Sequence, residues 1–399
     1  MDGLHIINVR PLGGASTTLT IRDGRFTDEP PRPGAPVLDA AGRLALPGLI
    51  EAHTHLDKSL IGMPWFRNDV GPRLIDKIDN EREARRQLPI PPRRQSLRQA
   101  LQSVGHGTTH IRSHIDIDTE CGLSGLEGVM QTRADLADVV GIDLVAFPQS
   151  GLLIRPGTAA LMEQAVRLGA ETVGGLDPCA IDRDPKGHLD VVFGLAERYG
   201  RAVDIHLHEP GEMGAFSMEL IIERTKALGM QGKVVISHAF CLGSADAGLV
   251  NPLVEALAAA RIAIVTTAPP SRPVPVFTQL VRAGVAICAG SDGFRDTWGP
   301  YGNGDMLERG MMLGLRNNLR RDDELSLVLA AITTVAAEVL HLPDHGLQSG
   351  CRGDLVLVDA ETVAEAVAQR PGARTTIRRG KVVAVDGAAR HRPSAADEV

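Results

Sequence analysis

The sequence is poor in aromatic residues, and it has no run of basic residues. Phenylalanine, tryptophan and tyrosine together make up 3% of the chain, so few side chains could stack on the bases of a single-stranded nucleic acid. The 42 lysines and arginines are outnumbered by 49 acidic residues, which gives a net charge of −7. This balance argues against nucleic acids and anionic membranes as partners.

Long apolar segments and paired cysteines are also missing. No apolar stretch approaches the roughly 18 residues of a transmembrane helix, and the first residues, MDGLHIINVRPLGG, lack the pattern of a signal peptide. The five cysteines are scattered and never form a CxxC pair, which is typical of reduced thiols. We therefore expect a soluble cytoplasmic protein, and the sequence leaves open whether it forms a homo-oligomer.

The middle of the chain alternates short apolar strands with helical patterns such as GTAALMEQAVRLGA and FSMELIIERTKALGM. Eight segments read as parallel strands: PGLIEAHTH, TTHIRSHID, IDLVAFPQ, ETVGGLDP, AVDIHLHE, KVVISHAF, IAIVTTAP and VAICAGSD. Eight strand–helix units indicate an α/β fold, a (β/α)8 TIM barrel over residues 47–343. A doubly wound open sheet is the alternative, but the glycine-rich phosphate loop that it would need after the first strand is missing.

Both ends of the chain are patterned as short strands separated by turn residues. The segments are LHIINV, STTLTI and RLAL near the start, and GDLVLVDA and RTTIRRGKVVAVDG near the end, with a hairpin expected at Gly380-Lys381. We expect residues 1–46 and 344–399 to combine into one small β-sandwich domain beside the barrel.

Histidines gather at the carboxyl ends of the predicted strands, where TIM barrels carry their active sites. Six of the 13 histidines lie there, and Asp292 ends the eighth strand; the six are His53, His55, His114, His206, His208 and His238. Residues two apart on a strand point to the same side, so His53 and His55 can face one ion. We predict that one divalent metal, Zn²⁺ or Fe²⁺, is bound by His53, His55, His206 and Asp292.

Two further residues in these strands have positions suited to catalysis. Glu209 follows His206 by three residues, just past the fifth strand, so its carboxylate can reach a substrate without binding the metal and act as a proton shuttle. His238 ends the next strand, from which it can hydrogen-bond the attacking water or the tetrahedral adduct. A lone polar residue at a strand end is as readily structural, so the prediction depends on the whole combination.

The order HxH, HxxE, His and Asp resembles the amidohydrolase superfamily. The stretches EAHTHLDKS, IDLVAFPQSG and GSDGFRDTWGPYGNGDML are similar to cytosine deaminase and its relatives in particular. This resemblance implies a barrel with one divalent metal, which hydrolytically removes ammonia from an N–C(NH2) group of a small N-heterocycle. It also implies that the enzyme needs no carbamylated lysine, because the fourth strand ends in GGLDP without one.

The resemblance also implies roles for single residues. His53, His55, His206 and Asp292 match the metal ligands, Glu209 the proton shuttle and His238 the water-orienting histidine, while Gln149 matches a glutamine that hydrogen-bonds the pyrimidine. Our hypothesis for the reaction is attack of metal-bound hydroxide on the ring carbon. Asp177 and Trp298 are further candidates for substrate contacts, and Trp65 and Phe66 for a lid over the ring. The relatives carry a second acid after the aspartate of the eighth strand, where this chain has Gly293.

Two other functions compete with the deaminase hypothesis. The same metal chemistry could open a cyclic amide or amidine, or cleave an N-alkyl C–N bond. The barrel could also be a metal-binding scaffold without activity, although binding a metal would require neither Glu209 nor His238. The nucleobase-editing zinc deaminases are excluded, because their PCxxC motif fails here: Cys179 follows Pro178, but residue 182 is Asp.

Overall fold

Eight parallel strands form one of the two sheets in the computed structural model, which describes residues 3–391. Neighbouring strands pair in chain order. They are β6 (Leu49–Thr54), β7 (Thr108–Asp116), β8 (Gly141–Phe147), β9 (Thr172–Leu176), β10 (Ala202–His206), β11 (Val234–Ser237), β12 (Ala263–Thr266) and β13 (Ile287–Ala289). Each corresponds to one of the eight predicted segments.

The first and last strands of this sheet meet and close the barrel. The backbone N–H of Asp292, just past β13, donates to the carbonyl of His53 on β6 at 2.8 Å, and Thr54 forms a parallel bridge with Asp292. A glycine is needed at this junction, because a Cβ on Gly290 would lie 2.5 Å from the Cβ of His53. The predicted TIM barrel is therefore confirmed.

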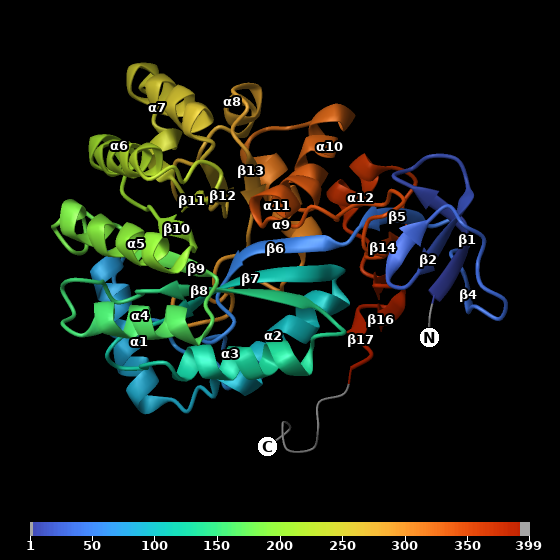
Figure 1. The fold of residues 1–399 in the computed structure, drawn as a ribbon, viewed down its shortest axis with the longest axis horizontal. Coiled ribbons are helices and arrows are strands. Elements are labelled where there is room, and N and C mark those ends of the chain that lie inside the picture. Colours follow the sequence, from blue (N-terminus) through green and yellow to red (C-terminus); the bar gives the residue numbers. More distant parts are fainter. Residues whose placement is uncertain (1–2, 392–399) are drawn as a thin grey trace.

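Helices surround the barrel and connect its strands (Figure 1). Two helices, α1 (Leu74–Gln87) and α2 (Pro92–Gly105), lie in the long connection from β6 to β7. The others around the barrel are α3 (Ser124–Asp135), α4 (Thr158–Leu168), α5 (Pro185–Tyr199), α6 (Gly211–Ala227), the 3-10 helix η1 (Phe240–Gly243), α7 (Ala247–Ala260), α8 (Phe277–Arg282), α9 (Met306–Arg316), α10 (Asp322–Ala331) and α11 (Thr334–Val339). The apolar faces of most of these helices pack on the strands in one large buried core, and α11 packs with β6, β12 and β13 in a smaller one.

Local sequence signals explain where a typical helix begins and ends. At the start of α5 the Asp184 carboxylate accepts a hydrogen bond from the N–H of Gly187 at 2.8 Å, and Pro185 occupies the first helical position. At its end Gly200 takes up a left-handed conformation, which ordinary side chains disfavour.

The two ends of the chain combine into a second, mixed sheet beside the barrel (Figure 1). Its nine strands are β1 (Gly3–Pro11), β2 (Thr17–Arg22), β3 (Arg25–Thr27), β4 (Val37–Asp39), β5 (Leu44–Pro47), β14 (Leu355–Val358), β15 (Arg374–Arg378), β16 (Lys381–Val385) and β17 (Ala388–Ala389), with α12 (Val363–Gln369) between β14 and β15. The antiparallel pairing of β5 with β14 joins the two ends, and the predicted hairpin lies between β15 and β16.

A buried ion pair fastens this sheet to the barrel. The guanidinium of Arg374 on β15 donates to both carboxylate oxygens of Asp305, at 2.7 and 2.8 Å, and Arg374 is fully buried. A planar, two-bonded pair of this kind fixes the orientation of both partners. Within residues 3–391, no helix combines the length and the apolar character needed to cross a membrane.

Candidate active site

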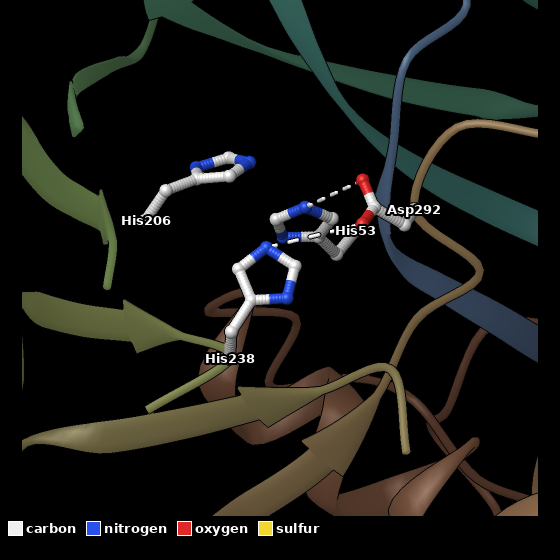
Figure 2. Close-up of side chains that lie close together, drawn as sticks. All are labelled: His53, His206, His238 and Asp292. Carbon is white, nitrogen blue, oxygen red and sulfur yellow. Dashed lines mark ion pairs between the residues drawn. The ribbon is translucent and has the colours of Figure 1, made fainter. Parts of the chain in front are cut away.

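Four side chains from distant parts of the chain converge at the carboxyl end of the barrel. They are His53 from β6, His206 from β10, His238 directly after β11 and Asp292 directly after β13, and their candidate ligand atoms lie within 4.8 Å of one another (Figure 2). Asp292 Oδ1 lies 3.7 Å from His53 Nε2, and Asp292 Oδ2 lies 4.0 Å from His238 Nε2. The structure thus gathers three of the four residues predicted to bind a metal.

The fourth predicted ligand, His55, lies at the edge of this group. Its Nε2 is 3.2 Å from Asp292 Oδ1, and its Nδ1 is 3.8 Å from Asp116 Oδ1. His238, predicted only to orient water, lies among the tight group of four in place of His55. Both histidines are therefore within reach of a cation held by Asp292.

The protonation states of these four side chains suit the binding of a divalent cation. Burial, reinforced by the neighbouring imidazoles, lowers the pKa of His206 well below its ordinary value. The buried Nε2 atoms of His53, His206 and His238 have no hydrogen-bond partner among the described residues. Burial alone would raise the pKa of Asp292, but the neighbouring imidazoles of His53 and His55 hold it well below the ordinary value. Neutral imidazoles beside an ionised carboxylate are the donor set of zinc or ferrous sites.

The His55 imidazole carries a positive charge, which a bound metal ion would replace. Burial and the nearby Lys58 would lower the pKa of His55, but the neighbouring carboxylates of Asp116 and Asp292 outweigh both and raise it to about 9. The site therefore already provides a place for positive charge beside Asp292. Metal binding at such a site releases protons from its ligands.

A hydrogen-bonded chain behind His53 determines which of its ring nitrogens carries the proton. Ser237 Oγ must donate to the Asp204 carboxylate, 2.7 Å away, because a carboxylate only accepts. His53 Nδ1, 2.9 Å from the same oxygen, is therefore the donor, and its Nε2 keeps a lone pair directed toward Asp292. Partners of this kind orient metal-binding histidines in proteins.

Three residues of the site have left-handed backbone conformations. The φ angles are 36° at Asp177, 70° at His238 and 65° at Asp292. Such conformations are uncommon outside glycine and persist where the surrounding structure holds them. Here the N–H of His238 is held by Val265 O at 2.7 Å, and that of Asp292 by His53 O. The left-handed conformations at His238 and Asp292 turn the backbone just after two strands, so that these side chains point into the cluster.

A cavity of about 240 Å³ opens above the cluster. His55, His206, His238 and Asp292 contribute to its wall, and Phe147 stacks on His206 with ring centroids 4.0 Å apart. The size suits a single small ring system more than a large ligand.

Glu209, the predicted proton shuttle, has its carboxylate held by hydrogen bonds beside this cavity, and its role stays a prediction. Its Oε1 accepts hydrogen bonds from the backbone N–H groups of Cys179 and Ala180, at 2.8 and 2.7 Å, and its Oε2 accepts one from the Ser217 hydroxyl. Glu209 is buried and is not among the described residues that line the cavity. Its carboxylate instead joins the loop after β9 to α6.

His208, the residue before Glu209, lies in the cavity wall. Its ring is stacked on that of His238, with centroids 4.2 Å apart. His208 Nδ1 donates to Asp177 Oδ2 at 2.7 Å, so Nε2 is the nitrogen left for other contacts. Asp177 is buried, supports His208 and is not among the described residues of the cavity wall; its predicted contact with the substrate stays a prediction.

The other predicted substrate contacts lie where a substrate could reach them. Gln149 and Trp298 both line the cavity. Trp65 and Phe66 line an adjoining pocket of about 600 Å³ instead, which shares Trp298 with the first cavity. Sequence periodicity does not distinguish these two locations, because both depend on how the connection after β6 folds back.

Sequence reasoning missed Lys58. This residue follows the HxH pair in HTHLDKS, lines the cavity and is almost fully buried, with its ammonium 2.6 Å from the Gln149 side-chain oxygen. The available signal was its position in the loop at the carboxyl end of the first strand, where barrels place functional residues.

Comparison with known proteins supports this description. A family model described as "Amidohydrolase family" matches residues 123–384. The solved structure of N-isopropylammelide isopropylaminohydrolase from Burkholderia multivorans ATCC 17616 is 49% identical, with coverage of 98% of this chain and 100% of that one and a TM-score of 0.94.

Two more distant proteins are similar over most of their length. N-isopropylammelide isopropyl amidohydrolase of Pseudomonas sp. (strain ADP) is 29% identical over 357 residues, 88% of each chain. The structure of 5-methylcytosine deaminase from Klebsiella pneumoniae liganded with 5-fluorocytosine is 29% identical, with coverage of 95% and 97% and a TM-score of 0.81. The chain therefore belongs to the amidohydrolase family, as its motifs indicated, and is a hydrolase of C–N bonds other than peptide bonds.

Proposed function

We propose that the protein hydrolyses the bond between a ring carbon and an exocyclic amine of a small N-heterocycle. The observation that carries this proposal is the 49% identity with N-isopropylammelide isopropylaminohydrolase over 98% of the chain. The cavity of about 240 Å³ above the histidine cluster supports it, because that volume is in the range of a single heterocycle.

We further propose that the reaction depends on one divalent metal, zinc or iron. His53, His55, His206 and Asp292 are the predicted ligands, with His238 beside them. When bound there, such an ion would supply Lewis acidity and make a bound water acidic enough to act at neutral pH.

The protein's own groups can then be given separate tasks. Asp292, ionised and beside the histidines, can accept the proton of the attacking water. His238 can donate a hydrogen bond to the oxygen on which charge develops. His208, which faces the cavity and is held by Asp177, is the candidate for contact with the departing nitrogen. We assign this last task to His208 because the contacts of Glu209 direct its carboxylate elsewhere.

The departing amine could be ammonia or an alkylamine. Ammonia corresponds to the deaminase hypothesis, and an alkylamine to cleavage of an N-alkyl bond. The adjoining pocket of about 600 Å³ favours the second possibility, because apolar side chains such as Leu60, Phe66 and Val70 line it and would accommodate an alkyl substituent. Lys77, Asp296, Trp298 and Gly299 belong to both walls, so the two spaces adjoin.

A product assay tests the proposal. The zinc- and iron-loaded proteins would be incubated with N-isopropylammelide, ammelide, cytosine, 5-methylcytosine and pterin. Ammonia and isopropylamine are measured separately by chromatography, and ring opening is followed by mass spectrometry. We expect amine release with the ring intact from at least one compound. Ring-opened products alone, or no product from any of them with fully loaded protein, would contradict the proposal.

A further inference from the structure

The seam between β6 and β13 places two of the predicted metal ligands face to face. His53 lies on β6 and Asp292 directly after β13, and Figure 2 shows the Asp292 carboxylate turned toward the His53 ring. Every other neighbouring pair of barrel strands is joined by a ladder of paired residues. Within residues 3–391, the pairing across this seam is the single bridge between Thr54 and Asp292, so other contacts have to fix the two strands relative to each other.

The Glu51 carboxylate spans the seam. Glu51 is buried, and its Oε1 accepts hydrogen bonds from the backbone N–H of His53 at 3.1 Å and from that of Ser291 at 2.9 Å. The first of these N–H groups belongs to a predicted metal ligand, and the second belongs to the residue directly before Asp292. One oxygen atom therefore ties the backbone of β6 to the backbone that carries Asp292.

The Thr54 hydroxyl supports the same junction from the other side of His53. It donates to the backbone carbonyl of Asp292 at 2.8 Å and accepts from the Gln99 amide of α2, also at 2.8 Å. The N–H of Asp292 donates to His53 O, so the peptide groups on both sides of the Asp292 Cα are held. This support explains how Asp292 keeps its left-handed φ of 65°, since such conformations persist where the surrounding structure holds them.

We propose that Glu51 and Thr54 are positioning residues, which set the placement of Asp292 relative to His53 and thereby the affinity of the site for a divalent metal. The inference rests on the proposed function, since it concerns the same metal, and it adds two side chains that act only through the backbone. Neither is among the described residues that line the cavity. A metal requires its ligands at defined distances and angles, so a small displacement of one ligand weakens binding.

Two substitutions of Glu51 separate the reach of its side chain from its charge. Glu51→Asp keeps the charge but is one methylene shorter, so its oxygen no longer reaches both N–H groups. Glu51→Gln loses the charge but keeps an acceptor oxygen, and Oε2 has no hydrogen-bond partner among the described residues that could be lost. We expect the zinc dissociation constant to rise about 10- to 100-fold in Glu51→Asp, as is typical for residues that support metal ligands, and to stay near the wild-type value in Glu51→Gln.

A second pair of variants tests Thr54 and also serves if Glu51→Asp does not fold. Thr54→Val removes the hydroxyl with little change of shape and should weaken zinc binding about 10-fold, whereas Thr54→Ser keeps the hydroxyl and should bind zinc normally. Affinity is measured by competition with a chelator. The visible absorption spectrum of the cobalt-loaded protein reports the arrangement of ligands around the ion, so it should change in Glu51→Asp and Thr54→Val and not in the conservative partners.

Asp182→Ala is a matched control for the loss of a buried acceptor. The Asp182 carboxylate is buried and accepts from the backbone N–H groups of Leu152 and Ile154, at 3.1 and 3.2 Å, in loops away from the seam. Its removal should lower the melting temperature without changing the zinc affinity or the cobalt spectrum. A purely stabilising role of Glu51 would give the same result as this control.

The outcomes distinguish this inference from the proposed function. Wild-type zinc affinity in folded Glu51→Asp or in Thr54→Val would overturn the inference, as would an equal loss in Glu51→Gln or in the control, or a wild-type protein that binds no zinc. Amine release from the panel above would leave the proposed function standing in each of these cases. The expected pattern of affinities without release of any amine would support the inference and contradict the proposed function.

Discussion

Replacing Ser237 with alanine removes the link between His53 and Asp204 without touching the metal cluster directly. The hydroxyl accepts from His53 Nδ1 at 2.9 Å and donates to Asp204 Oδ1 at 2.7 Å, and all three residues are buried. Without it, the Nδ1–H of His53 loses its acceptor. The other tautomer, which places the proton on the nitrogen facing Asp292, becomes easier to reach, so a metal should be bound more weakly.

The size of this effect follows from two independent figures. Removing one partner of a buried hydrogen bond costs about 1–3 kcal/mol. Loss of a residue that supports a metal-binding histidine typically costs about 10- to 100-fold in metal affinity. At about 1.4 kcal/mol for each factor of ten, this range corresponds to about 1.4–2.8 kcal/mol. The two figures agree, so we expect a 10- to 100-fold increase in the zinc dissociation constant.

The assay is competition for zinc between the stripped protein and a chelator of known affinity. Ser237→Thr keeps the hydroxyl and should keep most of the affinity. Ser96→Ala is a matched control, because it removes another buried hydroxyl, 2.7 Å from Thr132 Oγ1 on the outer helices, and should lower thermal stability without changing zinc affinity. Wild-type zinc affinity in Ser237→Ala, or an equal loss in Ser96→Ala, would refute the reasoning.

Three further predictions concern the cluster and the cavity. His53→Ala should lose bound metal and turnover together, and full metal occupancy by elemental analysis would contradict its assignment as a ligand. His208→Ala should retain metal yet lose turnover by about 10²- to 10⁴-fold, the contribution expected of a proton-transfer group. Glu209→Gln should reduce turnover less than His208→Ala does, because the Glu209 carboxylate contacts the loop after β9 and α6. A larger loss of turnover in Glu209→Gln than in His208→Ala would return the role of proton shuttle to Glu209. Removing the metal with a chelator should abolish turnover reversibly and lower the melting temperature, since a ligand that binds the folded state alone stabilises it; an unchanged melting temperature would speak against a metal in this cluster.

The position of each functional element along the chain is visible in the amino-acid pattern. Apolar segments such as VVIS and AICA are recognisable as buried strands because each is short and is followed by helical periodicity. Since all strands of a barrel point the same way, a residue at the carboxyl end of one strand lies near those at the ends of the others. This rule alone was sufficient to group His53, His206 and Asp292, which are far apart in the chain.

The directions of individual side chains could not be obtained in this way. Glu209 and His208 are adjacent, so whether one or the other faces the cavity depends on a left-handed bend at Asp177 and on amide donors contributed by the loop after β9. The orientation of Gln149 depends on Lys58, Glu81 and Asp116, which come from three separate segments and meet only when α1 packs against the barrel. Periodicity describes a residue's place on its own element, whereas contacts of this kind arise between elements, and they exist only after the chain has folded.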